Sequence, residues 1–501
     1  MAQFTDCRRA GLLLHPTSLP GPAWQGQLGA PAHAFIDFLA SAGATVWQTL
    51  PLCPVDSTGS PYQSSSVFAG EPALIDLEGL AAQGLLAVET VRAALETGCD
   101  APQHRRLLAQ AAAALSQAPV ALQAEFARFC QEEAGWLEPY ALFHALHDRL
   151  AAPWWAWPVG LRDREPAALA QAADELTGEL HTQRFEQFAF DAQWRQLKQA
   201  ANARDVLLFG DMPMFVAHDS ADVWANRELF HLDGEGHMTR VAGVPPDYFS
   251  ADGQLWNMPH YNWPAMASDG YAWWTRRLAR QRQWFDLIRI DHFRGFAAAW
   301  AVAPGQSTAR EGRWEPGPGA AMFHTLAERL GPLPLVAEDL GLITPDVDAL
   351  RDSLDLPGMR VLQFAFDGDA GNVHLPHNHV RNAIVYTGTH DNPTALGWWA
   401  GLDAAARAQV RDYLGPGDEV MPWLLIRPTL ASVAGCAVLP LQDVLGLGEQ
   451  ARLNTPGTAD GNWSWRYPQG ALDPSLAERL RHLFALYGRL PDSTAPAAAA
   501  D

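Results

Sequence analysis

The chain has 501 residues, 48% hydrophobic and 18% charged, which is typical of a globular protein. It carries 35 basic and 56 acidic side chains, so its formal charge of -21 disfavours nucleic acid and anionic membranes as partners. The single lysine, Lys198, falls in an amphipathic helical pattern, which leaves no candidate for a phosphate-binding loop or a Schiff base. Five scattered cysteines and the lack of an apolar run near 20 residues predict a cytoplasmic protein without a zinc site.

Short apolar runs recur along the chain, and each ends in polar or aromatic residues. Eight such runs separated by helix-length segments predict an α/β fold, a (β/α)8 TIM barrel with large, mainly helical inserted subdomains. A doubly wound sheet is the alternative, but the first run lacks the glycine-rich turn of that fold. The predicted strands cover residues 11–16, 45–52, 206–213, 287–293, 334–341, 359–366, 383–391 and 435–443.

The length of the chain exceeds the roughly 250 residues of a plain barrel. We therefore expect one catalytic domain over residues 1–490, with a helical subdomain inserted at 53–205 and a second insertion at 214–286. The second insertion contains an aromatic segment, 243–261, which has neither helical nor strand periodicity and is expected to be an ordered surface loop beside the site. Residues 491–501 are rich in proline and alanine and are expected to be disordered.

Carboxylates follow several of the predicted strands, at the end where barrel enzymes carry their catalytic residues. They are Asp211, Asp291, Glu338 and Asp391. Converging carboxyl groups drive their pKa values apart, and one ionised and one protonated carboxyl group are what glycosidic bond cleavage requires. Each could also be a turn or capping residue. Arg289, two residues before Asp291, would keep that carboxylate ionised, although a structural ion pair has the same pattern.

Histidines at 374, 377 and 379 superficially resemble a zinc cluster. They lack a nearby cysteine or carboxylate and contain a proline between them, so surface histidines in a loop are the preferred interpretation, with no metal.

Twenty tryptophans are present, and several lie outside apolar stripes, where their faces could stack on sugar rings. These are Trp154, Trp155, Trp157, Trp256 and Trp263. The aromatic segment adds Tyr248 and Phe249 to this set.

A series of ordered motifs between about residues 11 and 485 resembles the amylomaltases, the 4-α-glucanotransferases of glycoside hydrolase family 77. The motifs are LLLHPTSLPGP (12–22), SPYQSSSVFAG (60–70), FGDMP (209–213), DYFSADGQLWN (247–257), RIDHFRGF (289–296), AEDLG (337–341), FAFDGD (364–369), GTHDN (388–392) and NTPGT (454–458). The resemblance implies a barrel with inserted subdomains and a retaining double displacement on α-1,4-glucans: maltooligosaccharides, starch or glycogen. It implies no cofactor, and it leaves the oligomeric state open.

The resemblance also implies roles for individual residues. Asp291 matches the nucleophile, Glu338 the general acid/base, and Asp391 a third carboxylate that stabilises the transition state. Substrate contacts are implied for Tyr62, Asp211, Arg289, His292 and His390, and on the acceptor side for Tyr248, Phe249 and Trp256. Four positions depart from the family pattern: Gln27 lies where aspartate is common, Cys53 where glycine is common, Ser57 where some members have a tyrosine of a remote glucan site, and Pro393 where aspartate is usual.

Three rival functions share parts of this pattern. An amylase-type hydrolase would use the same carboxylates, a starch-binding protein would explain the tryptophans, and a magnesium-dependent lyase would use the carboxylates as ligands.

Overall fold

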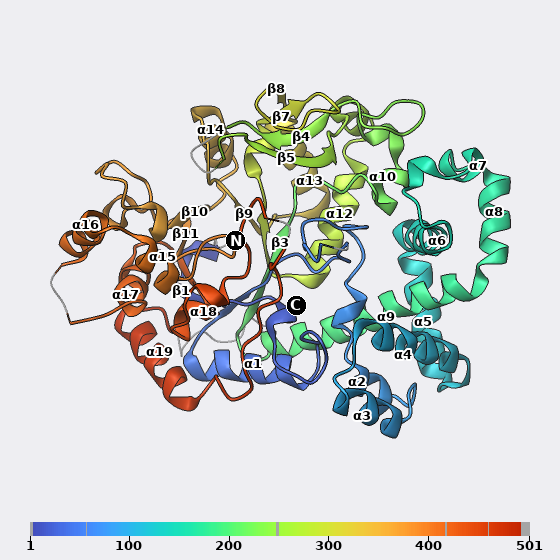
Figure 1. The fold of residues 1–501 in the computed structure, drawn as a ribbon, viewed down its shortest axis with the longest axis horizontal. Coiled ribbons are helices and arrows are strands. Elements are labelled where there is room, and N and C mark those ends of the chain that lie inside the picture. The colour runs from blue at the N-terminus through green and yellow to red at the C-terminus, as the bar shows by residue number, and fades with distance from the viewer. Residues whose placement is uncertain (1–3, 57, 247–249, 416–417, 459, 492–501) are drawn as a thin grey trace.

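A computed structural model describes residues 4–56, 58–246, 250–415, 418–458 and 460–491. Its centre is a parallel eight-stranded sheet with the order β10-β11-β12-β1-β2-β3-β6-β9 (Figure 1). At the two edges the Ala337 amide donates to the Pro357 carbonyl over 2.9 Å, so the sheet is nearly closed. The strands are β1 (Arg9–Leu13), β2 (Val46–Gln48), β3 (Leu207–Met212), β6 (Leu287–Ile290), β9 (Leu335–Ala337), β10 (Gly358–Val361), β11 (Ala383–Tyr386) and β12 (Cys436–Pro440).

Each of the eight predicted runs overlaps one of these strands, which confirms the barrel and not the doubly wound sheet. Every barrel strand contributes to one small buried cluster that includes Leu13, Val46, Phe209, Val336 and Ile384. A cluster with a member from each strand is the filled interior of a barrel. A second and larger cluster joins the barrel to its helices.

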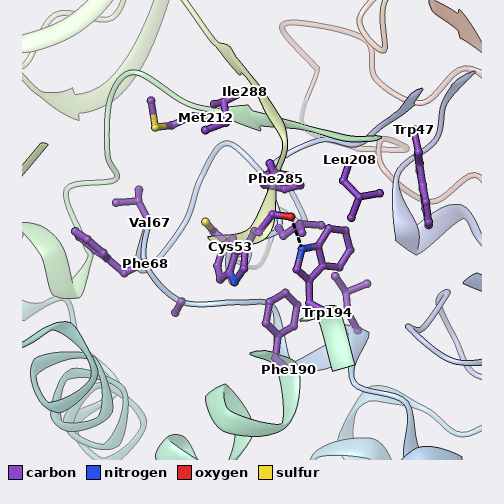
Figure 2. Packing of buried hydrophobic residues seen from close by; sticks show 14 of the residues in the cluster. Trp47, Cys53, Val67, Phe68, Phe190, Trp194, Leu208, Met212, Phe285 and Ile288 are labelled. Atoms are coloured by element: carbon purple, nitrogen blue, oxygen red, sulfur yellow. Dashed lines mark hydrogen bonds between the residues drawn. The ribbon is translucent and has the colours of Figure 1, made fainter. Parts of the chain in front are cut away.

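The helical insertion lies between β2 and β3, on one side of the barrel (Figure 1). Its last and longest helix returns the chain to the barrel: Trp194 donates its indole N–H to the Trp284 carbonyl over 3.0 Å, and Phe190 packs nearby (Figure 2). The helices are α2 (Leu77–Ala82), α3 (Val88–Glu96), α4 (Ala101–Ala114), α5 (Val120–Glu132), α6 (Ala134–Leu150), α7 (Val159–Arg162), α8 (Pro166–Glu175) and α9 (Thr177–Asn202).

Tryptophans in this insertion are packed and do not offer a platform for sugars. Trp154 and Trp157 are fully or almost fully buried, and Trp155 stacks on His218 at 3.9 Å. The interpretation that Trp154 and Trp157 stack on substrate is therefore wrong: Trp154 lies in a short 3-10 turn, whose spacing hides its burial from a search for helical periodicity.

A second sheet, antiparallel and four-stranded, has the order β5-β4-β7-β8. Its strands are β4 (Val241–Val244), β5 (Gln254–Pro259), β7 (Ala298–Val302) and β8 (Gly312–Pro316). The expectation that 243–261 has no strand structure is wrong where β4 and β5 pair, and β7 and β8 were not predicted. β8 carries the polar residues Arg313 and Glu315 and lacks an apolar run, whereas β7 is a short apolar run that was not singled out.

The other helices flank the barrel and the second sheet (Figure 1). They are α1 (Ala30–Ala42), α10 (Ala221–Ala225), α11 (Trp263–Ser268), α12 (Ala272–Trp284), α13 (Gly319–Leu330), α14 (Pro345–Ser353), α15 (Ala395–Gly401), α16 (Ala404–Leu414), α17 (Trp423–Ala431), α18 (Leu441–Val444) and α19 (Pro474–Leu486). Within the described ranges, none is long and apolar enough to cross a membrane. The limits of the domain and its insertions stay predictions, and residues 492–501 of the predicted tail lie outside the described residues.

Candidate active site

Four carboxyl groups lie at one end of the barrel. Asp211 belongs to β3, Asp291 and Glu338 directly follow β6 and β9, and Asp391 lies in the loop after β11. Because the strands are parallel, their carboxyl ends meet at the same rim. The sequence spacing of these residues therefore brings them together in space.

Arg289 connects two of these carboxyl groups. It contacts Asp211 Oδ2 through Nη1 over 2.6 Å and Asp291 Oδ1 through Nη2 over 2.9 Å. Asp211 has no exposed side-chain surface, whereas the side chain of Asp291 is 30% exposed. Burial raises the pKa of Asp211, and Arg289 acts against that rise. Arg289 is thus a structural partner of Asp211 and also a fixed positive charge beside Asp291, where an anion is stabilised.

Glu338 lies one strand away from Asp291, in register with it: Ile290 pairs with Ala337, and each carboxyl group follows directly. Its Oε2 accepts the His292 amide over 2.8 Å and its Oε1 accepts the Leu340 amide over 2.9 Å. Burial raises the pKa of Glu338 to about 8, with Asp291 adding to the rise and Arg289 opposing it. The rim therefore holds two partly buried carboxyl groups, one paired with Arg289 and one that favours its proton.

Asp339 has a different environment although it is the next residue. Its Oδ1 accepts the Met359 amide over 2.6 Å, and its Oδ2 pairs with Arg351 over 2.5 Å and with Arg360 over 3.2 Å. Strand alternation turns it away from the carboxyl group of Glu338. Asp339 therefore joins β9 to β10 where the barrel closes.

Tyr62 and His390 link the first carboxyl groups to Asp391. The Tyr62 hydroxyl donates to Asp211 Oδ2 over 2.9 Å and lies 2.9 Å from His390 Nε2, which is 3.3 Å from Asp391 Oδ1. The rings of Tyr62 and His390 stack with centroids 5.4 Å apart. Asn454 donates to Asp391 Oδ1 over 2.6 Å. Sequence reasoning gave Asn454 no role, although it opens the NTPGT motif.

Trp256 and His292 form the side of the site that faces the second sheet. Their rings meet edge to face with centroids 4.8 Å apart, and His292 directly follows Asp291. Burial lowers the pKa of His292 to about 4, so this ring is neutral at pH 7. Tyr248 and Phe249 lie outside the described residues. The other nine predicted site residues all lie at this rim or contact one that does.

The histidines at 374, 377 and 379 are held by hydrogen bonds within the protein. His374 Nδ1 accepts the Val361 amide over 3.2 Å, His377 Nδ1 lies 2.7 Å from the Tyr413 hydroxyl, and His379 Nδ1 lies 2.7 Å from the Ser432 hydroxyl. His379 is buried, so describing all three as surface histidines is wrong. In the part of the chain that the structure describes, no group of three or more histidine, cysteine, aspartate or glutamate side chains could hold a metal ion.

A parallel barrel whose rim unites a carboxylate with a neighbouring protonated carboxyl group is the arrangement of enzymes that cleave glycosidic bonds. Comparison with known proteins gives the particular family. The model of the family described as 4-alpha-glucanotransferase matches residues 14–472, and the chain belongs to this family, glycoside hydrolase family 77. It is a transferase that acts on α-glucans, so the starch-binding and lyase alternatives fall away, as does a simple hydrolase.

Two relatives named 4-alpha-glucanotransferase are 47% identical to this chain. The protein of Synechocystis sp. aligns over 97% of this chain and 98% of its own, and that of Thermus thermophilus over 96% and 99%. The structure of an amylomaltase from Streptococcus agalactiae in complex with acarbose superimposes with a TM-score of 0.92 at 34% identity, covering 97% of this chain and all of that one. An amylomaltase from Corynebacterium glutamicum shares the fold at 19% identity and a TM-score of 0.75.

Proposed function

We propose that the enzyme transfers a segment of an α-1,4-glucan by a double displacement through a covalent glucosyl-Asp291 intermediate. The observation that carries the proposal is the difference between two neighbouring, partly buried carboxyl groups: Asp291 is paired with Arg289, whereas Glu338 has its pKa raised to about 8 by desolvation and by the nearby Asp291. Neighbouring strands lie about 4.8 Å apart. Adjacent, in-register carboxyl groups favour the separation of about 5–5.5 Å that retaining enzymes use over the longer separation of inverting ones.

In the first step Glu338 gives its proton to the oxygen of the leaving glucan while a carboxylate oxygen of Asp291 bonds to the anomeric carbon. Arg289 keeps Asp291 ionised before the step and stays with Asp211 after it, because Asp291 loses its charge in the ester. The two backbone amides that face Glu338 stabilise the carboxylate that this step leaves behind.

In the second step the ionised Glu338 takes the proton of an incoming 4-hydroxyl group, whose oxygen replaces Asp291 at the anomeric carbon. A sugar hydroxyl group gives transfer and water gives hydrolysis, so the outcome depends on how well the acceptor is held and water excluded. We assign the acceptor side to Trp256, together with Tyr248 and Phe249.

The donor sugar is held by the polar chain of Tyr62, Asp211, Arg289 and His390, with Asp391 on the hydroxyl groups of the distorted ring. His390 is a neutral ring whose pKa is lowered by burial, so it can donate from one nitrogen and accept at the other. The related amylomaltase from Streptococcus agalactiae was solved with acarbose, which supports an oligosaccharide site in this chain.

Trapping of the intermediate tests the mechanism. In Glu338→Gln the second step lacks its base, so a maltosyl donor with fluoride as leaving group should load the protein, and intact-mass spectrometry should show one added maltosyl group. The matched double variant Asp291→Asn/Glu338→Gln should gain no mass. Loading of the double variant, or loading at another residue, would contradict the role of Asp291. Wild-type enzyme with maltotriose should give a ladder of longer glucans and glucose.

A further inference from the structure

The loop that joins β11 to α15, residues 387–394, carries His390 and Asp391. Beneath it lies a cavity of about 20 Å³, room for about one water molecule, lined by Asn392, Pro393 and Asp443 among others. Packing on this side of the loop is therefore incomplete, and hydrogen bonds contribute to its position.

A single buried carboxyl group holds both ends of this loop. Asp443 lies in α18, after β12, and is 1% exposed. Its Oδ2 accepts the hydroxyl group of Thr387, where the loop begins, over 2.6 Å. Its Oδ1 accepts the amide of Ala395, directly after the loop ends, also over 2.6 Å. Each oxygen of Asp443 thus has its own donor, one before and one after His390 and Asp391 in the chain.

We propose that Asp443 is a positioning residue for the transfer reaction: it ties the ends of loop 387–394 together and so sets where Asp391 stands against the sugar. The inference rests on the proposed role of Asp391, which it extends. Asp443 does not touch the reacting atoms and acts only through the loop.

The two hydrogen bonds of Asp443, to the Thr387 hydroxyl and to the Ala395 amide, form a clamp on the loop, and their chemistry agrees with this role. Hydrogen bonds to an ionised carboxylate are about twice as strong as those between neutral groups. Burial raises the pKa of Asp443 to about 6, and the two donors act against that rise, so the group is ionised at neutral pH and accepts both bonds.

Further contacts also hold the loop. Gln363 donates to the Pro393 carbonyl over 3.0 Å, and the amide of Asn454 donates to the His390 carbonyl over 3.2 Å. The side chain of Asp391 is 43% exposed, and its Oδ1 accepts from Asn454 over 2.6 Å and lies 3.3 Å from His390 Nε2 in the same loop. A shift of the loop by 1 Å would therefore be passed on to its carboxylate, and misplacement of that size can cost about a hundredfold in rate.

Two substitutions at Thr387 separate a hydrogen-bond clamp from simple packing. Thr387→Val keeps the shape and removes the hydroxyl donor, whereas Thr387→Ser keeps the donor and removes a methyl group. We expect Thr387→Val to lower kcat for maltotriose about tenfold, with KM changed less than about threefold, and Thr387→Ser to stay near wild type. The reverse order, an active valine and an impaired serine variant, would overturn the clamp.

Asp443→Asn removes the charge and so weakens the bond to Thr387, and it should lower kcat in the same direction as Thr387→Val; the double variant should lose little more than Thr387→Val, since both changes act on the same contact. Asp76→Asn is the matched control, because Asp76 caps α2 with a similar bond to the Gly79 amide and lies in the helical insertion. If Asp443→Asn does not fold, the pair at Thr387 still decides. Additive losses in a folded double variant would overturn the clamp.

Asp391→Asn separates this inference from the proposed function on which it rests. An active Asp391→Asn enzyme would refute the role of Asp391 itself. An inactive Asp391→Asn enzyme beside a fully active Thr387→Val enzyme would refute only the clamp.

Discussion

The rim of the barrel and the base of the helical insertion both contain a buried arginine with aspartate partners. At the rim Arg289 pairs with Asp291, whose side chain is 30% exposed. At the base of the insertion Arg280 pairs with Asp191 over 2.9 Å, and that side chain is only 6% exposed. Asp191 also receives Arg195.

Aromatic rings complete the second arrangement. Arg280 lies over the rings of Trp136 and Trp284, at 5.1 and 4.7 Å from their centroids. At the rim, in contrast, Asp211 Oδ1 is buried without a hydrogen-bond partner, and Glu338 favours its proton. An arginine–aspartate pair thus contributes to stability where other groups cover it, as at Arg280. Where one carboxylate stays accessible, as at Arg289, the same kind of pair can take part in the reaction.

The largest expected effect comes from removing the accessible carboxylate. Asp291→Asn should lower the rate of maltotriose disproportionation by at least on the order of 10⁴, because the amide cannot form the intermediate. The matched Asp191→Asn should keep the specific activity of the folded enzyme and lose about 1–3 kcal/mol in the free energy of unfolding, measured with urea. A folded Asp191→Asn enzyme with an equally large loss of activity would contradict the comparison.

The two arginines should also differ when each is replaced by lysine. A lysine cannot bridge Asp211 and Asp291 as the forked guanidinium group does, so Arg289→Lys should lower kcat by about 10²-fold. Arg280→Lys should mainly lower the melting temperature. Steady-state kinetics together with thermal unfolding of both variants measure the two effects. Similar kcat values for the two variants would show that the greater exposure of Asp291 than of Asp191 does not explain the different roles of the two arginines.

Much of this architecture could be predicted from the sequence, for a physical reason. Barrel strands are buried on both faces, so they stand out as apolar runs, and the residue after each run lies at the catalytic rim. That reasoning located Asp291 and Glu338, and the family motifs gave their expected roles. Because the two carboxyl groups converge at one rim, a difference between their pKa values could be expected from the sequence. Which of the two keeps its proton depends on burial, and burial is known only from the fold.

Other features depend on contacts that no local pattern encodes. Asn454 meets Asp391 across 63 positions, and Asp443 meets Thr387 across 56, so neither could be found from spacing. The second sheet was missed because its strands are short, and β8 is also polar. Trp154 was misread because a lack of periodicity was taken as exposure, whereas a buried turn has no periodicity either.

A pH profile should report the proton on Glu338. Because the first step needs the protonated acid and its pKa is about 8, kcat/KM should fall as the pH rises through about 8, by about tenfold per further unit. The usual pKa is 4.5, so the folded state binds this proton more tightly than the unfolded state. The contribution to stability is full below about 4.5 and is lost as the pH rises to about 8.

Glu338→Gln removes that titration and provides the control. Its free energy of unfolding relative to wild type should increase steadily between these two pH values, as urea unfolding at several pH values would measure. A constant difference would show that Glu338 titrates normally.

The smallest expected effect concerns the aromatic side of the rim, where Trp256 packs edge to face on His292 beside Asp291. Trp256→Ala should let water reach the intermediate and raise the ratio of hydrolysis to transfer about threefold, less than about 1 kcal/mol in relative barrier height. Phe249→Ser should act in the same direction. The ratio of glucose to longer oligosaccharides from maltotriose measures it.

Trp314→Ala is the matched control for that substitution. Trp314 belongs to the same sheet, but Arg294 lies over its ring at 3.7 Å, so a face of the ring is covered by an arginine, as Arg280 covers Trp284. Its loss should reduce stability and leave the product ratio unchanged. An equal shift of the ratio in both variants would show that the sheet as a whole controls the access of water. The difference between covered and accessible side chains would then hold for the ion pairs of Arg280 and Arg289 but not for the tryptophans.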